Sequence, residues 1–307
     1  MTDGDRTGRV GQVGIYLKRL FRIFIHEKDW KVLPMAGLIA FIVAYVVGTN
    51  MFVNMEGTLI GALAFVCVCI WNGLFNSIQV VCRERDIIKR EHRTGMHISS
   101  YIVAHMIYQA FLCVMQVIIS LMVYRLMGVH FLQSGAITGN FVMDMGITLF
   151  LITYASDMLA LMCSCIVQTT TMAMTVMPFV LIIQLVFSGV AFPLRGSPAK
   201  IANGTISKWG IYAVCSESDY NSLPSTALYS AIRKFSAMPG IKEISQAIQK
   251  NNMQAQLGVL AGKYLQVPAY SFSGRTVLKD WLILVLFSLL YAAIGTIALE
   301  FIDHDKR

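Results

Sequence analysis

A short, strongly charged stretch lies between two of the most apolar segments of the chain, and it constrains the fold more than any other feature. Residues 58–81 before it carry no charged side chain, and residues 98–127 after it carry none before Arg125. Between them, five Lys or Arg residues interleave with three Asp or Glu residues, and the breaker Gly95 follows these charges. Charge between two membrane spans must lie outside the hydrocarbon, and its excess of Lys and Arg predicts the cytoplasmic side.

The composition supports a membrane protein. Hydrophobic residues make up 56% of the 307 residues and charged residues 14%, with a mean hydropathy of +0.62. A soluble domain carries about 25% charged residues, so the chain falls outside that class. The net charge of +8 invites a nucleic-acid interpretation. However, the basic residues gather where membrane topology requires them, without a basic stripe among exposed aromatics, so we predict no nucleic-acid partner.

The cysteines do not predict a metal site. Six of the seven lie in or beside apolar segments, where cysteine behaves as a small hydrophobe. The pairs Cys67/Cys69 and Cys163/Cys165 lack the spacing and the nearby histidines of a zinc site. Cys215 lies apart from the others, and either remains a free thiol or bridges two copies of the chain.

The hydropathy pattern predicts an all-α integral membrane protein with six transmembrane helices. A cytoplasmic tail and an amphipathic interfacial helix occupy residues 1–31, and a charged loop at 82–98 joins the second and third spans. Residues 193–276 form a large extracytoplasmic segment. The six spans are predicted at residues 32–51, 58–81, 99–127, 141–167, 172–192 and 277–301. With six spans, the N-terminus and the C-terminal part of residues 277–307 are both cytoplasmic.

The helix predicted before the first span is amphipathic. Its apolar face includes Leu17, Leu20 and Phe24, whereas Arg19 and Arg22 lie on the opposite face. A basic amphipathic helix next to a span is typical of a segment lying in the membrane interface. From periodicity alone, a specialised elbow helix and a generic juxtamembrane helix are equally good interpretations.

Two asparagines of the second span lie on one helical face. Asn72 and Asn76 are four residues apart. Amide groups at membrane depth are costly unless they meet a polar partner or a wet cavity. These residues therefore either line a cavity or form hydrogen bonds between helices.

Two ionisable residues lie within later spans. Asp157 interrupts a long apolar run, and His105 lies near the cytoplasmic half of the third span. An intramembrane carboxylate is a candidate functional group by default, and the alternative is a protonated or paired residue that locks helices together. His105 is either a proton-relay group or a packing residue. An acid–base pair would require the two side chains to lie within hydrogen-bond reach.

Two segments carry a family resemblance. The first contains Glu84-Arg85, Arg90-Glu91, Gly95 and Ser100-Tyr101, and the second runs from Phe187-Ser188-Gly189 to Trp209 and Tyr212. Both resemble the membrane domain of type-G-like ABC exporters of the ABC-2 class, without their nucleotide-binding domain. The resemblance implies an elbow helix, a cytoplasmic coupling helix and a re-entrant segment in the outer loop.

The resemblance also implies roles for individual residues. In the coupling segment, the charged residues contact an ATPase or clamp the loop to the elbow helix. Other residues line a substrate cavity, and Val190 and Ala191 occupy the position of a hydrophobic valve, where larger leucines are often found. The coupling residues are Glu84, Arg85, Arg90 and Glu91, and the cavity residues are Asn72, Phe75, Asn76, Ile182 and Leu185.

The chain lacks the motif of a P-loop ATPase. No G-x-x-x-x-G-K-[ST] sequence is present. We therefore expect a non-catalytic membrane subunit with no cofactor of its own, ATP and Mg²⁺ being bound by a partner ABC ATPase. The other expected partners are membrane lipid and a second copy or a paralogous chain. The expected function is export of an amphipathic or hydrophobic substrate, such as a lipid, a drug-like molecule or a modified peptide.

Two other functions remain as alternatives. The first is an ATP-independent channel or membrane scaffold, which would also need six spans but no ATPase. The second is an intramembrane enzyme that uses His105 and Asp157. An exporter would lose its function when no ATPase is present, whereas a channel would keep it, so this observation separates the two.

Overall fold

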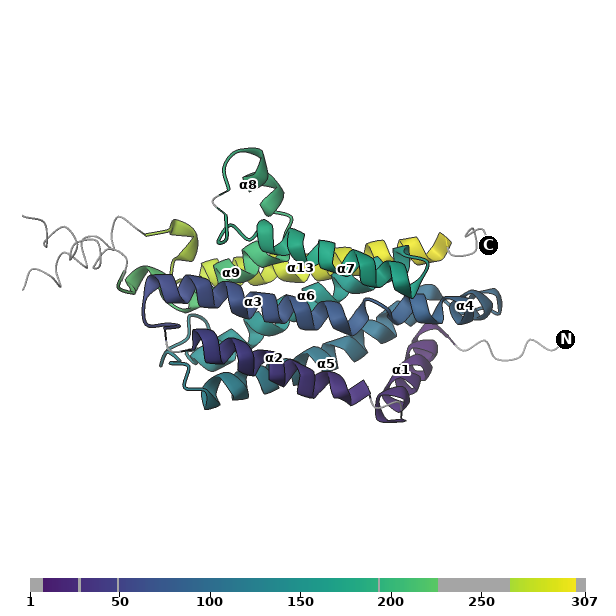
Figure 1. The fold of residues 1–307 in the computed structure, drawn as a ribbon. Coiled ribbons are helices and arrows are strands. Elements are labelled where there is room, and N and C mark those ends of the chain that lie inside the picture. Colours follow the sequence, from purple (N-terminus) through teal and green to yellow (C-terminus); the bar gives the residue numbers. More distant parts are fainter. Residues whose placement is uncertain (1–7, 27–28, 49, 193, 226–265, 302–307) are drawn as a thin grey trace, which may run out of the picture.

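The computed structural model describes residues 8–26, 29–48, 50–192, 194–225 and 266–301. Within these ranges every regular element is helical and no strand occurs. Most helices run side by side in an elongated bundle (Figure 1). The α-helices are α1 (Arg9–His26), α2 (Val32–Val47), α3 (Met55–Ser77), α4 (Val80–Arg93), α5 (Ile98–Leu126), α6 (Phe141–Ile166), α7 (Thr170–Val186), α8 (Ser197–Ala202), α9 (Ile206–Glu217) and α13 (Gly274–Glu300). Short 3₁₀ turns are η1 (Asp29–Lys31), η2 (Tyr220–Ser222) and η3 (Pro268–Tyr270).

Four helical stretches are long and apolar enough to cross a membrane. They are Met55–Arg93, which joins α3 to α4, together with α5, α6 and α13. The helices α2 and α7 are apolar but shorter. Lengths and hydropathies of this kind identify a helical integral membrane domain, as the composition predicts.

The charged stretch of the sequence is itself a helix. Only Ile78 and Gln79 separate α3 from α4, so α4 extends from the end of α3 beyond the bundle (Figure 1). It ends at Arg93, and the chain then turns at Gly95, whose φ of 105° is strained for residues with a side chain. The structure therefore places the charge in a helix rather than in an open loop.

The helix α6 lies at the centre of the bundle, between α3 and α13. Buried residues occur on all its sides, including Ile152, Ala155, Met158 and Ala160. A helix that is apolar all round is expected to be surrounded by other helices. By contrast, α2, α5 and α13 expose large apolar side chains such as Phe41 and Leu286, as helices facing lipid do.

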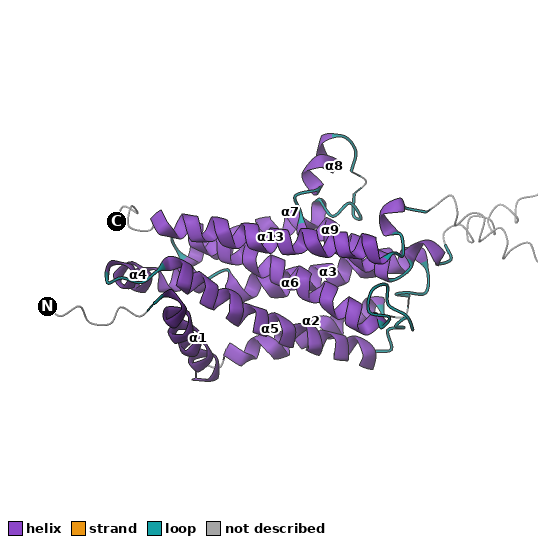
Figure 2. Ribbon diagram, turned by 180° about the vertical axis from the view of Figure 1, so that it is seen from behind, coloured by secondary structure: helices purple, strands orange, loops and turns teal. Residues whose placement is uncertain are grey.

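The helix α1 lies at an angle to the bundle, at the same end as α4 (Figures 1 and 2). Its apolar face packs on α5: Leu20 is buried, and the rings of Phe21 and Tyr108 lie 5.6 Å apart. This face is the one that the sequence assigns to the membrane interface. In the structure, much of it meets protein.

The segment after α7 differs from the predicted single long span. The helix ends at Val186 rather than at Phe192, and a turn with Gly189 at φ 81° follows. Farther on, α9 packs against α3, α6 and α13 and is mostly buried. Most of the predicted extracytoplasmic segment, residues 226–265, lies outside the described residues. Cys215 is fully buried within α9 as a free thiol, so it is not available to bridge two copies.

Candidate functional site

Asp157 joins three helices at the centre of the bundle. It projects from α6 and is fully buried. Its carboxyl group accepts hydrogen bonds from the Ser77 hydroxyl and, at 3.3 Å, from Asn76 Nδ2, both on α3. The Cys113 thiol of α5 donates a further contact at 3.5 Å. The hydrogen-bond partners of Asp157 are therefore polar side chains of two neighbouring helices, which the sequence alone does not reveal.

An amide pair extends this network. Asn76 Nδ2 donates to Gln116 Oε1 at 3.0 Å, and Gln116 Nε2 donates back to Asn76 Oδ1 at 2.9 Å. Asn76 thus makes interhelical hydrogen bonds, while Asn72 on the same helix is buried. Satisfied polar contacts of this kind hold membrane helices in one arrangement.

A glycine permits the close approach that the network needs. A Cβ atom on Gly73 would lie 2.3 Å from the Thr153 carbonyl oxygen and 2.8 Å from the Asp157 backbone nitrogen. Both atoms belong to the backbone of α6 and cannot move away easily. Small residues at helix contacts allow backbones to approach closely in membranes. Gly73 therefore brings α3 near enough for Asn76 and Ser77 to reach Asp157.

His105 does not form an acid–base pair with Asp157. Neither of its ring nitrogens has a hydrogen-bond partner among the described residues, although the side chain is buried. Its ring instead packs on Tyr101, with 4.5 Å between centroids. The intramembrane enzyme interpretation, which needs these two groups in contact, is therefore wrong for this structure.

One face of α4 is buried against the rest of the chain. Arg85 Nη1 donates to the carbonyl oxygens of Cys165 and Val167, both at 3.0 Å, at the C-terminus of α6. The Ser164 hydroxyl accepts the backbone N–H groups of Val81 and Cys82 at 3.1 and 3.2 Å. A cation at the C-terminus of a helix satisfies carbonyls that lack partners within the helix. Arg85 is thus an internal residue, unavailable to an ATPase.

A second face of α4 binds α1. Arg19 lies 3.1 Å from Glu84 and 3.6 Å from Glu91, and the Tyr16 hydroxyl donates to Glu91 at 2.8 Å. The Tyr101 hydroxyl of α5 donates to Glu84 at 3.3 Å. Burial, followed by the hydrogen bond to Glu91, raises the pKa of Tyr16 well above its ordinary value. The phenol therefore remains a donor at neutral pH.

The remaining face of α4 is exposed. Arg83, Asp86, Arg90 and Arg93 recur at helical spacing along it. Of the four charged residues singled out in the sequence, only Arg90 is on this face. The structure thus brings Glu84 and Glu91 together around Arg19 and separates them from Arg90.

The cavity residues predicted on α3 and α7 include three exposed apolar side chains. Phe75 is 42% exposed, Ile182 57% and Leu185 42%. Phe75 also contacts Trp71, with 5.0 Å between ring centroids. Val190 is half-buried and Ala191 is exposed, both in the turn after α7.

A second buried polar group escaped the sequence prediction. Glu217, at the end of α9, accepts a hydrogen bond from the Thr148 hydroxyl of α6, and Trp281 Nε1 donates to Thr148 Oγ1 at 2.6 Å. Glu217 lies in a segment that composition assigns to the aqueous outer loop. The apolar residues Ile206, Gly210, Ile211 and Val214 before it follow a helical period, which is the signal for a buried helix.

Comparison with known proteins identifies one family. Residues 11–215 match the ABC-2 type transporter family. Among curated proteins no sequence matches the chain. In the described part of the chain, no group of three or more His, Cys, Asp or Glu residues is arranged to hold a metal ion.

Proposed function

Because the chain belongs to the ABC-2 type transporter family, as its membrane component, we propose that it is the membrane subunit of a type-G-like ABC exporter. Members of this family generally work with ABC ATPase subunits. The proposed ATPase is a separate P-loop domain that binds ATP and Mg²⁺. The membrane subunit itself is not catalytic.

The division of α4 into three faces carries this proposal. Arg85 fixes α4 to α6, and Glu84 and Glu91 fix it to Arg19 of α1. The exposed face, with Arg90 at its centre, remains for the ATPase. A helix held this firmly transmits an applied force to α1 and α6 instead of bending under it. Movement of the ATPase would then displace α4, and α4 would displace α1 and the C-terminal end of α6.

We propose six membrane spans with both termini in the cytoplasm. The 16 residues of α2 measure about 24 Å, which is shorter than a hydrocarbon core of about 30 Å. However, α2 packs beside α3 and α5, and α7 contacts α3. In this arrangement α1 is the elbow helix, α4 is the coupling helix and α9 is the re-entrant segment of the outer domain, residues 193–276.

The exposed apolar residues of α3 and α7 support a cavity at a twofold axis. Two copies of the chain, or one copy and a paralogue, would face each other there, with Phe75, Ile182 and Leu185 lining the space between them. Asn72 and Asn76 lie behind this surface and contribute through packing and hydrogen bonds. An apolar surface of this kind suits a lipid, a drug-like molecule or a modified peptide.

Val190 and Ala191 lie where the substrate would leave the cavity. Their small side chains would form a looser valve than leucines would. Asp157 holds the helices beside the cavity at a fixed spacing, and we assign it a structural role. His105 lines a pocket that Phe75 and Asn76 also line.

Copurification tests the proposed function. The chain is expressed with ABC ATPases from its source and purified in detergent, in wild-type form and as Arg90→Glu. We expect the wild-type chain to retain one ATPase and the variant to lose at least 90% of it, while its thermal unfolding midpoint stays unchanged. If no P-loop protein binds the wild-type chain and vesicles containing it leak without ATP, the ATP-independent channel is the correct function.

A further inference from the structure

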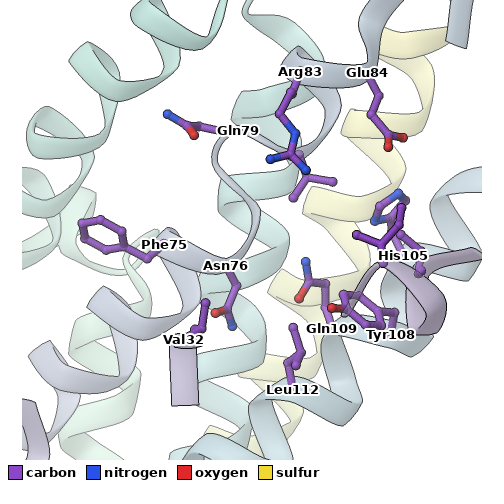
Figure 3. Close-up of a pocket in the computed structure, with 13 residues that line it drawn as sticks. Val32, Phe75, Asn76, Gln79, Arg83, Glu84, His105, Tyr108, Gln109 and Leu112 are labelled. Atoms are coloured by element: carbon purple, nitrogen blue, oxygen red, sulfur yellow. The ribbon is translucent and has the colours of Figure 1, made fainter. Parts of the chain in front are cut away.

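A pocket of about 200 Å³ lies between α1, the α3–α4 junction and α5. Arg83 and Glu84 line its upper end in Figure 3, and Val32 and Leu112 line its lower end. Arg83 and Glu84 belong to α4, so the charged end of the pocket lies at the edge of the bundle. The upper end is therefore charged, and the lower end is mostly apolar apart from the amides of Asn76 and Gln109.

Two buried side chains of α5 line this pocket without satisfying their polar atoms. His105 and Gln109 are each 1% exposed. Both ring nitrogens of His105 and the Oε1 atom of Gln109 lack a hydrogen-bond partner among the described residues. Buried polar atoms without partners destabilise a fold, so their presence beside a pocket indicates a ligand that supplies the missing bonds.

The unsatisfied atoms define the chemistry of that ligand. A neutral imidazole offers one donor and one acceptor, and the Gln109 carbonyl oxygen offers an acceptor. The ligand must therefore present at least two N–H or O–H donors and one acceptor beside His105 and Gln109. Arg83 lies at the charged end beside Glu84, and its guanidinium has five N–H donors, so it can donate to a phosphate in addition to its other partner. The apolar end requires a hydrocarbon portion.

We propose that this pocket binds the head group of a membrane phospholipid of the phosphatidylethanolamine class. The ammonium group donates to Gln109 and to one nitrogen of His105, while the phosphate accepts from the other nitrogen and lies toward Arg83. The first acyl carbons run along Val32 and Leu112. Phosphatidylcholine has the same phosphate, but its methylated ammonium has no N–H donor. The pocket shares Phe75 and Asn76 with the proposed cavity and Arg83 with the exposed face of α4, but lipid binding to it is a step beyond transport and requires no ATP.

The test compares the two lipids on the full chain. Purified, delipidated protein is titrated with phosphatidylethanolamine or phosphatidylcholine, and bound lipid is counted by native mass spectrometry together with the thermal unfolding midpoint. We expect one phosphatidylethanolamine to bind at least tenfold more tightly and to raise the midpoint. The double variant His105→Phe/Gln109→Leu should lose this preference. The matched variant His130→Phe/Gln133→Leu, at exposed positions between α5 and α6, should keep it.

A second variant guards against a folding defect. Ile23→Trp fills the pocket from α1 without removing a polar group, and it should also abolish the bound lipid. Equal binding of the two lipids by the wild-type chain, or unchanged phosphatidylethanolamine binding by Ile23→Trp, would overturn the proposal. Free phosphoethanolamine that binds as tightly as the intact lipid would overturn it too, because the ligand would then be soluble.

Discussion

At the scale of single residues, the buried polar groups have distinct roles that their residue types do not reveal. Asp157 is satisfied by Ser77, Asn76 and Cys113, whereas His105 has no partner among the described residues. The carboxyl group therefore acts as a bond between helices. The imidazole lines the pocket that is proposed to bind a phospholipid head group.

Replacing Asp157 tests its structural role. Asp157→Leu leaves the Ser77 and Cys113 donors buried without an acceptor, which costs about 1–3 kcal/mol of unfolding free energy. Asp157→Asn keeps one acceptor oxygen and should lose about half as much. Denaturant unfolding in detergent micelles measures both. Two variants with wild-type stability but no transport would instead place Asp157 on the substrate path.

At the scale of helices, close packing of α3 on α6 sets the geometry of the centre. Gly73 makes this packing feasible, and the hydrogen bonds of Asn76 and Ser77 follow from it. The same principle acts where α9 meets α6: a Cβ on Gly210 would lie 2.9 Å from Ile152 Cδ1. The neighbour at Gly210 is a flexible side chain, so that contact is more tolerant.

Gly73→Ala is therefore expected to be the more damaging glycine substitution. The new methyl group meets fixed backbone atoms of α6, and overpacking of this kind costs about 1–3 kcal/mol. The matched control is Gly14→Ala on α1, where no atom lies within 4 Å of the added Cβ. Unfolding midpoints of the two variants give the comparison. Equal midpoints would show that α3 and α6 are not as close as described.

The sequence predicts most of the helices, and the contacts that it does not predict have identifiable physical causes. Charge between apolar segments correctly locates α4, and the helical period places Val81, Arg85 and Ile88 on one face, which is a readable signal that Arg85 is buried. The partners of Asp157 lie on helices separated by long stretches of chain, so no local pattern reveals them. The apolar run of α9 is too short for a span, which is why the sequence predicts an aqueous environment for Glu217.

At the scale of the whole molecule, the exposed apolar surface has two parts with different proposed neighbours, lipid and a second copy of the chain. The outer sides of α2, α5 and α13 expose large apolar side chains, as surfaces that face lipid do. The side formed by α3 and α7 is proposed to face a second copy. Both are apolar, so composition alone does not distinguish them. The distinction depends on the position of the twofold axis.

Cysteine cross-linking locates that axis. In a background lacking Cys67 and Cys163, the two partly exposed cysteines, Ile182→Cys should cross-link to its counterpart in membranes treated with a short bifunctional maleimide. Leu286→Cys, on the lipid side of α13, is the control and should remain monomeric. Cross-linking only through Leu286→Cys would move the interface to α13 and would contradict the proposed cavity.

We propose that the exposed face of α4 receives the ATPase, and site-specific photo-cross-linking can detect that contact. A benzoylphenylalanine replaces either Arg90 or His130. Arg90 precedes α5 and His130 follows it, and the 29 residues of α5 span about 40 Å. We expect an adduct with a P-loop ATPase from position 90 and none from position 130. An adduct from position 130, or none from position 90 while the ATPase still copurifies, would contradict it.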